Sequence, residues 1–71
     1  MNTEYSFVRF HSNGKLWVLE PDKTKTELEI DASLPYHAKV LPHPSNGYCH
    51  LLFSDGGVLL DVKKEWFEII G

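Results

Sequence analysis

Polar and apolar residues alternate most clearly over residues 24–31. Charged side chains occupy one side of this segment, at Lys25, Glu27, Glu29 and Asp31, and apolar side chains the other, at Leu28 and Ile30. A period of two residues is typical of a β-strand with one face toward a core and one toward water. Exposed charge also opposes pairing with other chains, which suits an edge strand. The pattern therefore predicts a strand at the edge of a sheet.

Turn-forming residues divide the whole chain into short segments. They recur roughly every 8 to 12 residues, at Asn13-Gly14, Pro21-Asp22, Leu34-Pro35, the segment 42–47 and Asp55-Gly56-Gly57. Short apolar segments at this spacing are typical of antiparallel β-structure. Six strands are predicted, near residues 5–12, 15–20, 24–31, 36–41, 48–54 and 57–62.

The dipeptide Asn13-Gly14 predicts a tight hairpin between the first two strands. Asn-Gly favours the type I′ turn, because both central residues of that turn need positive φ. With these two residues at the centre, Phe10 pairs with Trp17 and Val8 with Leu19, on one wholly apolar face. That face is predicted to belong to the core.

Asp55-Gly56 predicts a second hairpin by the same reasoning. Its apolar face pairs Phe53 with Val58, Leu51 with Leu60 and Cys49 with Val62. The inward set is then Phe53, Leu51, Val58 and Leu60, and Cys49 is expected to be buried and inert. The extra Gly57 permits a shift of this register by one residue.

The segment 62–70 is compatible with two structures. Val62, Trp66, Ile69 and Ile70 share one helical face after an N-cap at Asp61, whereas Phe67 and Ile69 alternate as in a strand. We therefore expect either a short helix or turn packed across the end of the sheet, or a seventh strand.

These elements predict an all-β fold in a single domain over residues 1–71. The expected architecture is a small antiparallel meander or SH3-like barrel of five to six strands, with a short C-terminal helix as one alternative. Hydrophobic residues make up 42% of the 71 residues and aromatic residues 13%, which is enough apolar material for a packed core.

The charge and the cysteine content indicate which ligands and which cellular compartment to expect. Seven Lys and Arg against ten Asp and Glu give a net charge of −3, whereas proteins that neutralise many phosphates are basic. The single cysteine, Cys49, cannot form an internal disulfide, so a reducing, cytoplasmic location is expected. The sequence has no signal-peptide pattern and no apolar run near the roughly 18 residues that cross a bilayer, so no membrane association is expected.

The sequence carries no recognised motif for catalysis or cofactor binding. The four histidines, at 11, 37, 43 and 50, are separated by 26, 6 and 7 residues, which matches no compact zinc pattern. His50 lies opposite Asp61 in the second hairpin, an arrangement that favours a structural polar pair over an acid–base site. We therefore expect no enzyme, no catalytic residue, no cofactor and no metal.

Surplus aromatic residues point to binding instead. Tyr36, Tyr48, Trp66 and Phe67 have no evident place in the predicted core, and aromatic side chains are enriched at interface hot spots. The predicted partner-binding residues are Glu27, Glu29, Asp31, Tyr48, Trp66 and Phe67. The sequence thus favours a non-enzymatic inhibitor, adaptor or assembly subunit that binds a larger protein partner or itself.

Binding of single-stranded nucleic acid is the alternative function. Small β-barrels can stack bases on exposed aromatic rings, and Tyr48, Trp66 and Phe67 lie near Lys63 and Lys64 in the sequence. The acidic net charge and the small number of basic residues disfavour this alternative.

Overall fold

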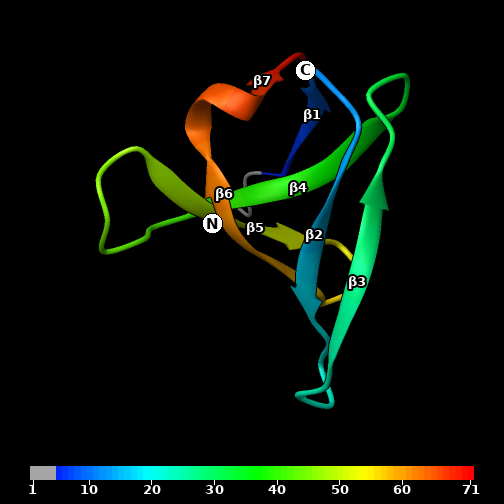
Figure 1. Cartoon of the computed structure of the whole chain (residues 1–71), viewed down its shortest axis with the longest axis vertical. Helices are drawn as coiled ribbons and strands as arrows, with labels where there is room; N and C mark the ends of the chain where they lie inside the picture. Colours follow the sequence, from blue (N-terminus) through cyan, green and yellow to red (C-terminus); the bar gives the residue numbers. More distant parts are fainter. Residues whose placement is uncertain (1–4) are drawn as a thin grey trace.

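The computed structural model describes residues 5–71 and shows seven antiparallel strands in one sheet (Figure 1). The strands are β1 (Ser6–Phe10), β2 (Gly14–Leu19), β3 (Lys25–Ile30), β4 (Pro35–Leu41), β5 (Tyr48–Phe53), β6 (Val58–Lys63) and β7 (Phe67–Ile69). Their order across the sheet is β3-β2-β6-β5-β4-β1-β7. The predicted all-β, antiparallel class is confirmed. There are seven strands rather than five to six, and the sheet is not closed, because β3 and β7 are its two edges.

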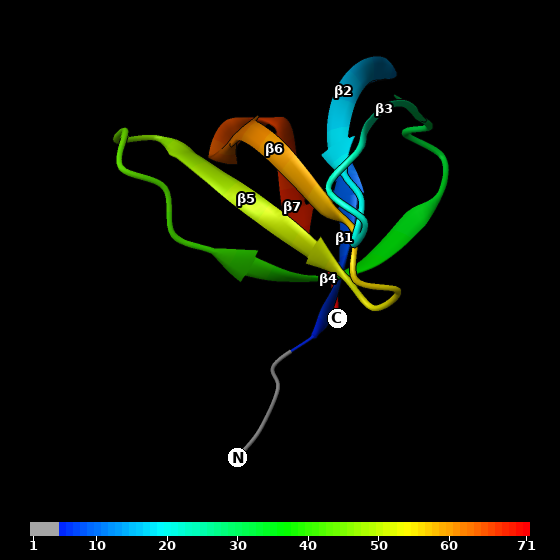
Figure 2. The ribbon, with the colours of Figure 1, turned by 90° about the horizontal axis from the view of Figure 1, so that it is seen from below.

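The sheet bends around a single core. Figure 2 shows β4, β5 and β6 as one side of the bend and the β2–β3 pair rising from it. Every strand contributes at least one buried side chain: Val8, Phe10, Val18, Ile30, Ala38, Cys49, Leu51, Leu59, Val62 and Phe67. Because these residues come from all seven strands, no hairpin buries its apolar face alone.

The predicted hairpin between residues 5–12 and 15–20 is wrong. β1 pairs with β4, where Val8 faces Tyr36, and with β7, where Phe10 faces Phe67. β2 pairs instead with β3 and β6. Asn13 and Gly14 do not form the type I′ turn, because neither has a positive φ, and the Asn13 Oδ1 instead accepts a hydrogen bond of 2.7 Å from the distant Ala32 N–H. A long-range hydrogen bond thus replaces the local turn.

The second hairpin forms with a partly altered register. Cys49 pairs with Val62 as predicted, but Leu51 pairs with Leu59 and Leu52 with Val58. Between these positions Leu60 and Asp61 oppose the single residue His50, which is a β-bulge. The bulge moves the inward position of β6 from the predicted Leu60 to Leu59, which is 0% exposed.

The C-terminal segment combines the two predicted alternatives. Lys64–Trp66 forms a single 3-10 turn, and Phe67–Ile69 then pairs with β1 as the seventh strand. The His11 N–H donates to the Trp66 carbonyl at 2.9 Å and holds the turn against the end of β1. No helix within residues 5–71 is long and apolar enough to span a membrane.

The two sheet edges differ in character. β3 carries Glu27 and Glu29 on its exposed face, which confirms the predicted charged edge strand. β7 has only three residues, and its Ile69 is 59% exposed. One edge is therefore long and charged, and the other is short and exposes both Glu68 and Ile69.

The two neighbouring leucines of β6 provide a test of this register. We expect Leu59→Ala to reduce the free energy of unfolding by about 2–5 kcal/mol, because it leaves a cavity in the core. Leu60→Ala, at a half-buried position, serves as the matched control and should cost less than half as much. Urea unfolding of both variants measures the difference, and a larger loss for Leu60→Ala would contradict the bulge.

The single thiol provides a second test. Burial raises the pKa of Cys49, an effect only partly opposed by the nearby Lys64, so the thiol stays protonated near neutral pH. We expect the folded protein to react with a thiol reagent at least about 100-fold more slowly than the urea-unfolded chain. Stopped-flow measurement of the labelling rate checks this expectation, and equal rates in the two states would contradict the burial.

Candidate interaction site

The outward face of the β2–β3 pair presents a tryptophan among charged side chains. In this register Trp17 lies directly opposite Glu27, and Lys15 lies opposite Glu29. Trp17 was assigned to the core by the predicted first hairpin, but its side chain points outward and is 53% exposed. An indole of this exposure, with one carboxylate opposite and another diagonal to it, is the type of residue that dominates binding interfaces.

The carboxylates of this face are free to interact with a partner. Glu27 and Glu29 are exposed, and among residues 5–71 no cation lies within ion-pair distance of either. Glu20, near the other end of the strand pair, accepts a hydrogen bond of 2.8 Å from the Thr26 hydroxyl. The β2–β3 face, defined here as Trp17, Glu27 and Glu29, therefore combines apolar area with two carboxylates that form no ion pair among residues 5–71, although Lys15 and Lys25 lie on the same side of the two strands.

Asp31 has a different role from the two glutamates. Its carboxylate accepts hydrogen bonds from the Ser33 hydroxyl at 2.6 Å and the Ser33 N–H at 2.9 Å. These bonds lower the pKa of Asp31 below its ordinary value. The Asp31 N–H donates to the Tyr36 hydroxyl at 3.0 Å. Asp31 thus stabilises the turn between β3 and β4. Tyr36, which had no evident place in the predicted core, contributes its hydroxyl to the same turn.

The remaining predicted aromatic residues separate into surface and core. Tyr48 and Trp66 both lie near the Lys63 ammonium, which is 5.9 Å from the Tyr48 ring centre and 5.8 Å from that of Trp66. Phe67 is instead buried and packs 5.7 Å from the Phe10 ring. Tyr48, Lys63 and Trp66, named here the aromatic–lysine cluster, therefore form a second surface from which Phe67 is excluded.

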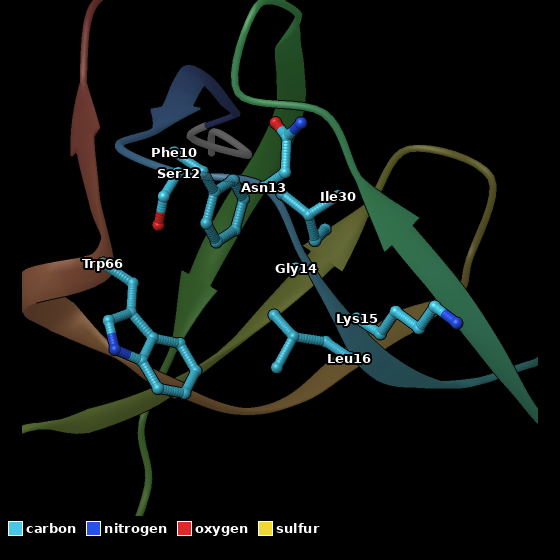
Figure 3. Close-up of a pocket in the computed structure, with 8 residues that line it drawn as sticks. All are labelled: Phe10, Ser12, Asn13, Gly14, Lys15, Leu16, Ile30 and Trp66. Atoms are coloured by element: carbon cyan, nitrogen blue, oxygen red, sulfur yellow. The ribbon is translucent and has the colours of Figure 1, made fainter.

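A small pocket opens beside Trp66. β2 pairs with β6 only at Val18 and Leu19, so the first half of β2 has no neighbour on that side and the edge of the core is accessible. The opening has a volume of about 190 Å³ and an apolar wall of Phe10, Leu16, Ile30 and Trp66 (Figure 3). Ser12, Asn13 and Lys15 lie at its rim. Pockets for small molecules usually measure about 300–1,000 Å³, so this one has the size of a single side chain.

A histidine pair gathers around Asp61 in the β-bulge. The Asp61 N–H donates to Nδ1 of His50 at 3.2 Å, while its Oδ1 lies 2.8 Å from Nε2 of His43. His50 and Asp61 are therefore adjacent, as predicted. The Asp61 carboxylate, however, interacts with His43 and not with His50. His43 lies in the loop after β4, and its Nδ1 accepts a bond of 2.9 Å from the Ser45 N–H. The sequence spacing gave no indication that His43 joins this pair.

The geometry gives the protein two candidate binding surfaces, one with Trp17 among charged side chains and one with a lysine near two aromatic rings. Comparison of the chain with protein-family models, with curated proteins and with solved structures gives no match. The function is therefore inferred from these surfaces.

Proposed function

We propose that this protein is a non-enzymatic interaction module whose β2–β3 face binds a basic surface of a larger protein. The observation that carries this proposal is the exposed indole of Trp17, placed opposite Glu27. A monomer gains nothing from exposing so large an apolar side chain, whereas burial against a partner removes it from water. An inhibitor, an adaptor or an assembly subunit would each act in this way.

Electrostatics support a basic partner. The net charge of −3 favours encounter with a cationic surface, and Glu27 and Glu29, which form no ion pair among the described residues, are available to pair with its cations. Trp17 then supplies the short-range apolar contact that slows dissociation. We therefore expect the charged residues to control the association rate and Trp17 to control the dissociation rate.

A cytoplasmic setting is part of this proposal. Cys49 is a free, buried thiol, which suits a reducing compartment. Self-association is the competing outcome for the same face, but a second copy would bring two sets of glutamates together, which costs free energy.

Capture of the partner tests the proposal. We expect tagged full-length protein to recover one dominant protein from native extract, in equal amount with and without nuclease. Trp17→Ala should weaken that complex by about 30-fold, corresponding to about 2 kcal/mol, mainly through faster dissociation. The double variant Glu27→Lys/Glu29→Lys should associate more slowly, and its association rate should no longer depend on salt. Trp66→Ala is the matched tryptophan control and should leave both rates unchanged.

Three results would overturn the interaction module. Unchanged affinity of Trp17→Ala for the captured protein would exclude the β2–β3 face. Loss of all recovery after nuclease treatment would favour nucleic acid as the ligand. A pure homo-oligomer in sedimentation, with nothing else recovered, would indicate a structural subunit.

Single-stranded nucleic acid is the second candidate ligand, and the aromatic–lysine cluster favours it. The Lys63 ammonium lies near the rings of Tyr48 and Trp66, and Lys64 lines a pocket together with Tyr48, so two rings and two cations lie close to one another. If this surface binds, single-stranded oligonucleotides should quench tryptophan fluorescence, and added salt should weaken the effect. Trp66→Ala should abolish the quenching and Trp17→Ala should not. A flat titration of mixed-sequence DNA and RNA would exclude this function.

A further inference from the structure

We propose that His43, His50 and Asp61 bind a divalent transition-metal ion such as Zn²⁺. One ligand atom from each of the three side chains lies within 4.8 Å of the others. Two imidazole nitrogens and a carboxylate oxygen form a ligand set typical of zinc, with a fourth position left for water or a partner's side chain. This site is separate from the β2–β3 face and from the proposed function, so either inference can hold without the other.

Three different elements bring these ligands together. His50 lies in β5, Asp61 in the bulge of β6, and His43 in the loop that follows β4. Asp61 adopts a positive φ of 54°, a conformation that asparagine and aspartate tolerate better than most residues. The bulge directs its backbone N–H to one histidine and its carboxylate to the other. Without the bulge, a regular strand would not present both groups on the same side.

The ligands are ordered without a metal ion. The rings of His43 and His50 pack with their centres 4.6 Å apart, and the Tyr48 ring lies 5.5 Å from His43 on the adjoining side. The side chain of His43 is only 11% exposed, whereas that of Asp61 is 71% exposed. Binding therefore needs little further ordering of the histidines, and an ion can enter from the Asp61 side.

The ligand atoms of the three side chains need to move only slightly to bind an ion. Zinc ligands about 2.0–2.1 Å from the ion lie roughly 3.3 Å from one another in a tetrahedron. Nε2 of His43 and Oδ1 of Asp61, at 2.8 Å, are already closer than this, so the ion separates them slightly. The third ligand approaches from at most 4.8 Å, and rotation of the exposed Asp61 side chain supplies the adjustment.

Proton transfer accompanies this binding. The Ser45 N–H donates to Nδ1 of His43, so the proton of the neutral ring lies on Nε2 and is shared with Asp61. The ion replaces this proton, which leaves to water, and Nδ1 takes a proton from water in exchange. The N–H of Ser45, an exposed residue, then bonds to water. His50, whose Nδ1 accepts from the Asp61 N–H, must also free one ring nitrogen, either by losing that hydrogen bond or by moving its proton to Nδ1. Because metal ligands must be deprotonated, binding should weaken on acidification.

Lys63 and Lys64 are cations near this site, and Lys64 lines a pocket together with His43. Lys63 follows Asp61 by two residues, but its ammonium is held toward the Tyr48 and Trp66 rings. Lys63→Ala should therefore leave zinc affinity unchanged or increase it slightly.

Titration of the full-length protein with Zn²⁺ alone, after removal of any purification tag, tests the proposal. We expect one ion per chain in calorimetry and a rise in Tm on the order of 5–10 °C at saturation, reversed by a chelator. His43→Ala and Asp61→Asn should each weaken binding at least about tenfold. Asn keeps the left-handed conformation of residue 61, so Asp61→Asn remains folded even if His43→Ala does not. His11→Ala, at an exposed position on another part of the chain, is the matched control.

Two results would overturn the metal site. The absence of both binding heat and a Tm shift would exclude it directly. Equal loss of affinity in His11→Ala, or no loss in Asp61→Asn, would show that the ion binds elsewhere. The visible spectrum of bound Co²⁺ provides an independent check, because a tetrahedral site absorbs strongly and adventitious surface binding does not.

Discussion

The placement of β1 between β4 and β7 is the constraint on which the rest of the structure depends. Val8 and Phe10 are buried only because β1 pairs with residues 35–38 on one side and residues 67–69 on the other. Both partners are distant in sequence, so β1 cannot be positioned until most of the chain is in place. Residues 11–13 connect β1 to β2, which lie apart in the strand order, and Ser12 and Asn13 line the pocket beside Trp66.

The sequence predicted the elements better than their pairing. All six predicted strands exist near their expected positions, because apolar alternation and turn residues are local properties. Asn13-Gly14 was misleading, since the Asn13 side chain bonds to Ala32, a residue 19 positions away. Leu59, and not the predicted Leu60, faces the core, because the additional residue in the bulge reverses which side of β6 faces inward.

The same distinction applies to the candidate sites. Glu27 and Glu29 could be placed on an exposed face from the alternation of their own strand. The role of Trp17 could not, because its orientation depends on whether β2 pairs with β1 or with β3. Neither could the position of His43, whose approach to Asp61 depends on the path of the loop over residues 42–47. Phe67 was assigned to the surface because its pairing with β1 involves residues almost sixty positions earlier.

The two edges of the sheet, β3 and β7, differ in length and in charge, so the sheet has two unlike ends. If the β7 edge of one copy were to pair with the β3 edge of another, successive additions would form an open fibre instead of a closed pair. Glu27 and Glu29 would then approach another chain in every new contact. Charge on an edge strand opposes such pairing, so neutralising Glu27 and Glu29, which we propose for partner binding, is expected to favour polymerisation as well as to weaken recognition.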